Sequence, residues 1–158
     1  MKKLLLVLVL FYANANEILE VSALHFNADE NSGIIELNEN VAIKKGKDEL
    51  YAPKVIINVD KNRKPTHYSA FGGVNFVVAT KDNRLLKGSA NEVHYNVLNG
   101  EYRLKGNSKV KEDNKVNTVV GEEIIVNNDI GFVNITGTQN KPAKIIFQME
   151  NQAESKKQ

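Results

Sequence analysis

The fold is decided by the stretch IIELNENVAIK, residues 34–44. Apolar and polar residues alternate along it, so that Ile35, Leu37, Val41 and Ile43 share one face and polar side chains occupy the other. Successive side chains of a strand point to opposite faces, and this period of two is therefore typical of a strand that is buried on one side. We find no convincing helical period over three turns.

The same alternation recurs along the chain, and turn residues separate the alternating segments about every 8 to 12 residues. Asn99-Gly100 is the strongest hairpin signal, because both residues accept the positive φ that a type I′ turn requires. We interpret Gly72-Gly73 as a bend between two strands. Many short strands with regular turns predict an all-β sandwich, barrel or jelly roll. The further alternating segments are residues 55–59, 74–80, 93–97, 102–105, 123–126, 132–135 and 144–149.

Two halves of the chain resemble each other at a spacing of about 67 to 69 residues. Residues 33–41 match residues 100–108, with Leu37 corresponding to Leu104. We therefore expect one strand module that is used twice.

The N-terminus has the pattern of an export signal. Lys2 and Lys3 precede an apolar run at residues 4–12, and Ala13 and Ala15 supply small residues for cleavage. As a helix this run would rise only about 14 Å, whereas a bilayer core needs about 20 residues, so we expect no permanent span. The predicted organisation is a cleavable signal peptide at residues 1–15, a β domain at residues 16–150 and a disordered polar tail at residues 151–158.

Composition narrows the class of protein. The chain has 21 basic and 19 acidic residues, and removal of Lys2 and Lys3 with the signal leaves the two signs equal. This balance argues against a nucleic-acid partner. The absence of cysteine excludes a disulfide, a thiolate zinc site, a cysteine nucleophile and a lipidated N-terminal cysteine. With neither a span nor a lipid anchor, we expect an exported protein that is soluble in the envelope space or released.

Residues that could carry out covalent chemistry do not form a recognisable set. His25, His67 and His94 have no partner at metal-ligand spacing, and we interpret them as surface residues of strands. Carboxylates such as Asp48 and Glu122 fall in turns or at strand starts, where charge faces water. The chain also lacks a nucleophile elbow, a phosphate loop and a dinucleotide fingerprint. We predict no enzymatic activity, no metal and no cofactor.

The inward face is rich in large apolar side chains, which are consistent with a closed core or with a β-sheet channel that holds acyl chains. The pattern alone leaves both interpretations open. The residues concerned are Phe26, Ile35, Leu37, Val55, Ile57, Phe76, Val93, Tyr95, Tyr102 and Leu104.

Three stretches carry a family resemblance: GVNF at residues 73–76, GSANEVHY at residues 88–95 and YRLKGN at residues 102–107. They resemble the LptA/OstA-like lipopolysaccharide transport proteins, which show an aromatic strand, then G-x-A-x-x-[apolar]-x-Y, a short hairpin and a strand ending L-x-G-N. Residues 37–43 resemble the preceding module, although Glu39 stands where glycine is usual. The resemblance extends over nearly all of residues 19–147.

The resemblance implies a twisted, open-ended β-jellyroll built from repeated strand modules. It also implies a periplasmic carrier that binds the lipid A part of lipopolysaccharide in an apolar β-groove and passes it from the inner to the outer membrane of a Gram-negative cell. The implied partners are an inner-membrane-anchored protein of similar fold, the periplasmic domain of an outer-membrane lipopolysaccharide assembly protein, and further copies of the chain stacked head to tail by strand addition.

Position within the matching motifs implies a set of lipid-facing residues on the inward side of the strands. Ile35, Leu37, Tyr102 and Leu104 join it because they share the inward phase. The motif positions themselves are Leu19, Val21, Phe76, Tyr95 and Val97.

Other functions remain open from the residues. The membrane-tethered partner of the same fold would retain its N-terminal span. A structural or adhesive β-sandwich would have a closed core. An envelope hydrolase acting on glycans would need two placed carboxylates, which we do not identify.

Overall fold

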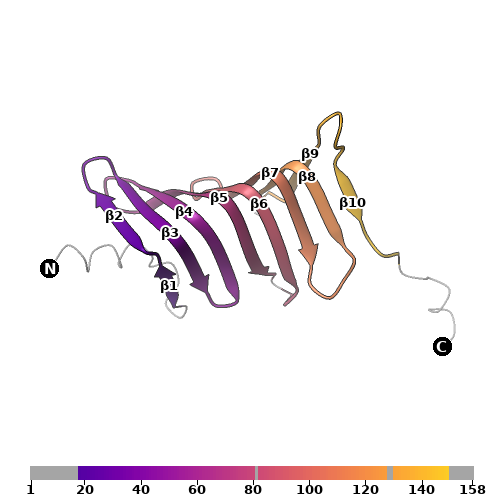
Figure 1. Cartoon of the computed structure of the whole chain (residues 1–158), viewed down its shortest axis with the longest axis horizontal. Coiled ribbons are helices and arrows are strands. Elements are labelled where there is room, and N and C mark those ends of the chain that lie inside the picture. The colour runs from indigo at the N-terminus through magenta and orange to yellow at the C-terminus, as the bar shows by residue number, and fades with distance from the viewer. Residues whose placement is uncertain (1–17, 81, 128–129, 150–158) are drawn as a thin grey trace.

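The computed structural model describes residues 18–80, 82–127 and 130–149 as ten antiparallel strands (Figure 1). The all-β prediction is confirmed. Ala13 and Ala15 of the predicted signal, and the tail at residues 151–158, lie outside the described residues. The strands are β1 (Leu19–Ser22), β2 (His25–Asp29), β3 (Ile34–Lys45), β4 (Asp48–Val59), β5 (Pro65–Ala79), β6 (Leu85–Asn96), β7 (Glu101–Glu112), β8 (Thr118–Asn127), β9 (Phe132–Thr136) and β10 (Lys144–Ile146).

The strands follow the order β1-β3-β4-β5-β6-β7-β8-β10, with β2 also paired to β3 and β9 also paired to β8. β2 pairs with the first half of β3, and β1 pairs with its second half. In the same way, β9 pairs with the second half of β8 and β10 with its first half. Six long strands, β3 to β8, therefore run through two half-sheets that have different edge strands.

Bulges divide the long strands at one level. The register shifts across every pair from β3/β4 to β7/β8. At these shifts β3, β5 and β7 carry two consecutive residues with positive φ: Glu39-Asn40, Gly72-Gly73 and Gly106-Asn107. A bulge bends its strand, and adjacent bulges therefore form one bend line across the sheet. We call the two sides the β2/β9 arm and the β1/β10 arm, after their edge strands.

Gly72-Gly73 lies inside β5, so the prediction of a bend between two strands is wrong. The ladder continues on both sides of the pair, from Phe71 to Val74. Both glycines have positive φ, and a Cβ at Gly72 would lie 3.0 Å from the Cγ of Pro53 on β4. The two glycines therefore let one strand turn the corner against its neighbour.

The predicted hairpin at Asn99-Gly100 does join β6 to β7, but its predicted turn type is wrong. Only Gly100 of this pair has positive φ, at 70°, whereas a type I′ turn requires two such residues. The Gly100 N–H donates to the carbonyl oxygen of Asn96 at 2.9 Å, and the side chain of Asn96 accepts from the N–H of Leu98 at 3.0 Å. The Asn96 side chain thus stabilises a longer loop.

The internal repeat has a structural counterpart. Leu37 on β3 and Leu104 on β7 belong to the same cross-strand row, and the residues that follow them, Asn40 and Asn107, both have positive φ at the bend. The two halves of the chain therefore place equivalent residues at equivalent levels. The prediction of repeated strand modules is confirmed.

Candidate functional site

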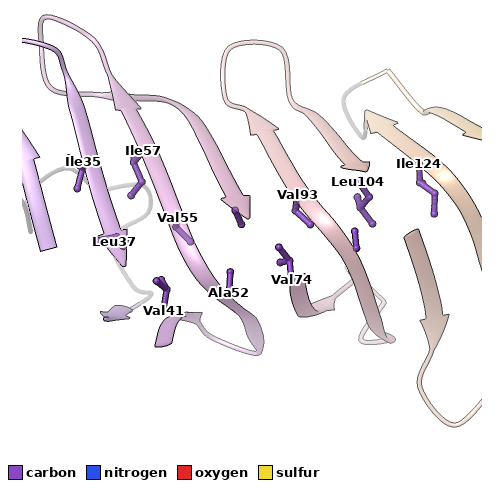
Figure 2. Close-up of a cluster of buried hydrophobic side chains, with 12 residues drawn as sticks. Ile35, Leu37, Val41, Ala52, Val55, Ile57, Val74, Val93, Leu104 and Ile124 are labelled. Carbon is purple, nitrogen blue, oxygen red and sulfur yellow. The ribbon is translucent and has the colours of Figure 1, made fainter. Parts of the chain in front are cut away.

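The inner face of the β2/β9 arm carries an apolar row that crosses eight strands. Each member is the cross-strand partner of the next, and the middle of the row is sealed from solvent, with Leu37 only 1% exposed. Figure 2 shows much of this row within the buried cluster. We call it the floor row: Phe26, Leu37, Val55, Ala70, Val93, Leu104, Ile124 and Ile135.

A second row lies on the same face, two residues farther from the bend. Its central part is a stack of three tyrosines: the ring centroids of Tyr68 and Tyr95 are 6.2 Å apart, and those of Tyr95 and Tyr102 are 4.2 Å apart. Burial, with a smaller contribution from Tyr95, raises the pKa of Tyr68 to about 12. We call this the tyrosine row: Ala28, Ile35, Ile57, Tyr68, Tyr95, Tyr102, Val126 and Val133.

The β1/β10 arm carries a matching apolar row on its inner face. Phe76 and Gly88 are cross-strand partners in it, and a Cβ at Gly88 would lie only 2.0 Å from the Cζ of Phe76. The far end of the Phe76 ring therefore occupies the space beside Gly88 that the side chain of any larger residue would fill. We call this the phenylalanine row: Val21, Ile43, Leu50, Phe76, Gly88, Val110, Val119 and Ile145.

Nearer the bend, the inner face of the β1/β10 arm has no side chain larger than valine. A Cβ at Gly121 would lie 2.8 Å from the Cγ2 of Ile135, which belongs to the floor row of the other arm. Small residues at this level leave room for the larger side chains of the floor row. The cross-strand pairs here are Val41 with Ala52, Val74 with Ala90, and Ser108 with Gly121.

The rows of both arms contribute to one buried apolar cluster, and we call the inner face that they line the trough. Along β7 burial weakens away from the bend, because Tyr102 of the tyrosine row is 38% exposed and Leu104 of the floor row is buried, whereas Ile35 and Ile57 of the tyrosine row are buried on β3 and β4. Burial also weakens toward both edges, where Phe26 on β2 and Ile145 on β10 are more than half exposed. The apolar lining therefore continues to the two ends of the sheet and meets solvent there.

The predicted lipid-facing residues all lie on β1, β3, β5, β6 or β7 or directly after β6. Ile35, Leu37 and Leu104 are buried, and Phe76 and Tyr95 are half-buried. Leu19 and Val21 lie on edge strand β1 and face the trough with Ile43, the partner of Val21. Val97, which follows β6, and Tyr102 are the most exposed of the set.

Sequence reasoning missed several members of the lining, because their place depends on register between strands. The tyrosine stack needs Tyr68, whose contact with Tyr95 follows from the β5/β6 pairing. Leu50 and Val110 likewise join the phenylalanine row only through their partners Phe76 and Gly88. Their alternation with polar neighbours was the available signal.

The outer face of the β2/β9 arm is polar and carries ion pairs. Arg103 donates to Glu101 at 3.1 Å and to Glu123 at 3.4 Å, and hydrogen bonding to Glu101 raises its pKa. Lys54 lies 3.7 Å from Glu36. These groups are partly exposed to solvent, so each pair adds little to stability.

His94 lies on this outer face, between Glu92 and Ser69. Its Nε2 is 2.9 Å from Glu92 Oε2, and its Nδ1 is 3.0 Å from Ser69 Oγ. The order of groups is that of a hydrolase triad, but Ser69 lies in a central strand paired with Ile56 on one side and His94 on the other. Backbone N–H groups engaged in the ladder are not available to stabilise an oxyanion, and we assign this set no catalysis.

A polar cluster lies at the end of the β1/β10 arm that carries the β5–β6 and β7–β8 turns. Glu112 is 6% exposed and accepts a hydrogen bond from the side chain of Asn117 at 3.0 Å. Lys115 and Arg84 lie 3.5 and 3.8 Å from its carboxylate. The Asn117 hydrogen bond is the main cause that lowers the pKa of Glu112, aided by the two cations.

Two further observations concern residues 18–80, 82–127 and 130–149. Within them we find no cluster of three or more side chains suited to hold a metal ion. The same residues contain no helix with the length and apolar character needed to traverse a bilayer.

This fold and this lining define a class of protein: a bent, open-ended antiparallel jellyroll whose two arms share an apolar trough. The chain belongs to the family described as LptA/(LptD N-terminal domain) LPS transport protein, whose model matches residues 20–132. Transport of lipopolysaccharide is the activity by which that family is described.

A solved structure has the same fold. LptH of Pseudomonas aeruginosa, described as the LptA-homologous periplasmic component of the lipopolysaccharide transport device, superposes with a TM-score of 0.70 at 19% identity. The match covers 84% of this chain and 96% of LptH. The predicted twisted, open-ended jellyroll is thereby confirmed. A search of curated proteins found no match.

Proposed function

We propose that this chain is a periplasmic carrier that binds the lipid A part of lipopolysaccharide in its trough and passes it from the inner toward the outer membrane. The observation that carries this proposal is the continuous apolar lining, which crosses eight strands on each arm and ends in exposed apolar side chains at both edges. In a β-sandwich with a closed core, the edge strands would not need apolar side chains that face solvent.

Burial of acyl chains supplies the binding free energy. Each methylene removed from water contributes about 0.8 kcal/mol, and the continuous apolar rows keep that contribution while a chain slides along the trough. Transfer needs no covalent step. Any driving force therefore comes from a partner.

Lipid contact is expected where the lining is accessible. Phe76, Tyr95, Tyr102 and Val97 are half-buried or exposed and supply the contact surface. Leu19 and Val21 extend it to edge strand β1. The sealed residues Ile35, Leu37 and Leu104 form the packed base beneath the acyl chains.

The edge strands give the proposed route for assembly. β1 and β2 at one end, and β9 and β10 at the other, each pair with a single neighbour. An open edge accepts another strand through backbone hydrogen bonds. The proposed neighbours are an inner-membrane-anchored protein of similar fold, the periplasmic domain of an outer-membrane assembly protein, and further copies of this chain head to tail.

Site-specific photocrosslinking tests the proposal. A photoreactive residue at position 76 should crosslink to lipopolysaccharide in cells, whereas one at position 75 should not. Asn75 is exposed on the opposite face of the same strand and is therefore the matched control. Equal labelling at both positions, or none at 76, would contradict the trough assignment.

Substitution gives a second test. Phe76→Asp places a charge in the apolar row and should abolish lipid binding, while circular dichroism shows the sheet retained. Asn75→Asp should bind normally. A folded Phe76→Asp protein that binds lipid as the wild type does, or native protein that extracts without lipid, would favour a structural β-sandwich instead.

A further inference from the structure

Hydrogen bonds within the turn between β4 and β5 hold its backbone in one conformation. The Oδ1 atom of Asp60 accepts from the N–H of Asn62 at 2.8 Å and from that of Lys64 at 2.9 Å. The Asp60 N–H donates to the carbonyl oxygen of Lys64, and the Arg63 N–H donates to that of Asp60, both at 2.9 Å. Arg63 has a φ of 62°. A turn held in this way displays its side chains in a preorganised arrangement.

This turn carries three exposed cations, Lys61, Arg63 and Lys64. One carboxylate accompanies them, that of Asp60, and its Oδ1 atom is committed to the two backbone N–H groups. On the opposite arm, several cations are held in ion pairs: Arg84 lies 2.8 Å from Asp82, and Lys115 lies 3.5 Å from Glu112. The β4–β5 turn thus has excess positive charge at the rim of the trough.

The turn also follows the apolar lining directly. Val59, the last residue of β4, packs against the buried cluster, and Lys61 comes two residues later. At about 3.3 Å per residue this separation is about 7 Å. An amphiphile with its acyl chains on the lining would therefore bring its polar head to these cations.

We propose that the β4–β5 turn, through Lys61, Arg63 and Lys64, binds phosphate groups on the head of the lipid held in the trough. The inference rests on the proposed function and adds a polar subsite to it. Arg supplies a planar fork of N–H donors that matches phosphate oxygens, and Lys supplies a compact charge. The ordered backbone limits the entropy lost when an anion binds.

The chain has a second group of cations, on the outer face of the β1/β10 arm. Lys87 and Lys111 are cross-strand partners there, and Lys109 is on the same side of β7 as Lys111. Their neighbours Gly88 and Val110 belong to the inner phenylalanine row, so the lysines point away from the trough. All three are exposed, with Lys87 3.2 Å from the carboxylate of Asp113, and they provide a control of equal charge for an effect that does not depend on position.

The test compares two triple variants for binding to purified lipid A in detergent. The first is Lys61→Gln, Arg63→Asn and Lys64→Gln, with Asn chosen at position 63 because it tolerates positive φ. The control is Lys87→Gln, Lys109→Gln and Lys111→Gln. We expect the turn variant to bind bisphosphorylated lipid A about tenfold more weakly than the wild type does. It should bind enzymatically dephosphorylated lipid A as tightly as the wild type does. The control should match the wild type with both ligands.

Any other outcome contradicts either the phosphate subsite or the carrier function. A folded turn variant that binds both lipids as the wild type does overturns the subsite and leaves the carrier function intact. Equal weakening by both triple variants shows a general charge effect and also overturns it. Wild-type protein that binds neither lipid overturns the carrier function itself.

Phosphate from bilayer lipids is the other source of this ligand chemistry. Vesicles of phosphatidylglycerol and of phosphatidylcholine distinguish it by co-sedimentation. We expect the turn variant and the wild type to behave alike with both. Loss of phosphatidylglycerol binding in the turn variant, with binding of bisphosphorylated lipid A unchanged, would assign the turn to a membrane surface and overturn the proposal. If the triple variant fails to fold, Lys61→Gln alone should show a smaller loss restricted to the phosphorylated lipid, and no such loss would overturn it.

Discussion

The two arms line one trough, but they fill it differently. The row of the β2/β9 arm nearest the bend contains the buried leucines Leu37 and Leu104, whereas the corresponding row of the β1/β10 arm contains nothing larger than valine. Farther out both arms carry aromatic rings. Two converging sheets cannot both be bulky where they meet, since interiors are close-packed. The arms are therefore complementary, with one supplying the packed base and the other the room for it.

Truncation of a leucine on each arm should give the largest effect and expose this difference. Leu37→Ala should lower the free energy of unfolding by about 3 kcal/mol, because it leaves a cavity in a sealed row. Leu50→Ala in the half-buried phenylalanine row should cost about 1.5 kcal/mol. Urea denaturation measures both, and equal losses would mean that the two arms are packed alike.

Filling the space above Gly88 tests the β1/β10 arm. Gly88→Val should displace the Phe76 ring and cost about 2 kcal/mol of stability through overpacking, together with weaker lipid binding. Phe76→Ala combined with Gly88→Val should cost less than the two single changes together, since the side chains share one space. Strict additivity in thermal unfolding would refute this contact.

Relief of backbone strain at the bend should have a smaller and opposite effect. Glu39 has a φ of 62°, which is unfavourable for a residue with a Cβ. Glu39→Gly should therefore raise the free energy of unfolding by about 1 kcal/mol, net of the entropy that glycine loses on folding. Asn40→Gly is the control and should gain less, because asparagine tolerates this region. No rise in melting temperature for Glu39→Gly would contradict the strain argument.

The tyrosine row should make stability depend on alkaline pH, with no effect near neutrality. The pKa of Tyr68 is raised from 10.0 to about 12 by burial, so the unfolded chain loses this proton first. Stability should then be fully present below about pH 10 and fall as pH rises toward 12. Tyr68→Phe should flatten that fall in urea titrations at pH 9 to 12. An unchanged slope would show that Tyr68 titrates normally in the folded protein.

The strand faces could be predicted from sequence because their period is local. Ile35, Leu37 and Ile43 alternate with polar neighbours, and all three do face the trough. The open-ended jellyroll was predicted from the family motifs. The same motifs predicted the set of inward-facing residues that includes Phe76 and Tyr95, and the contact of these residues with lipid stays a prediction.

The bend and the geometry of the site could not be predicted from local sequence patterns. A positive φ at Glu39 runs against the preference of glutamate, although glycine is usual there in the family and its absence was the available hint. The tyrosine stack, the Gly88 space under Phe76 and the Ser69 contact of His94 all join residues on different strands. Pairing register decides them, and no local pattern encodes it.

The bend line also makes the protein extensible. Its positive-φ pairs, Glu39-Asn40, Gly72-Gly73 and Gly106-Asn107, return about every 33 residues, once per hairpin of two strands. Neighbouring strands are about 4.8 Å apart, so each hairpin adds about 10 Å of trough with the corner already in place. Duplication or deletion of one hairpin unit would change the length of the lined path by a fixed step and preserve both edge strands. The span between two membranes could thus be adjusted by counting hairpins within a chain as well as by stacking chains.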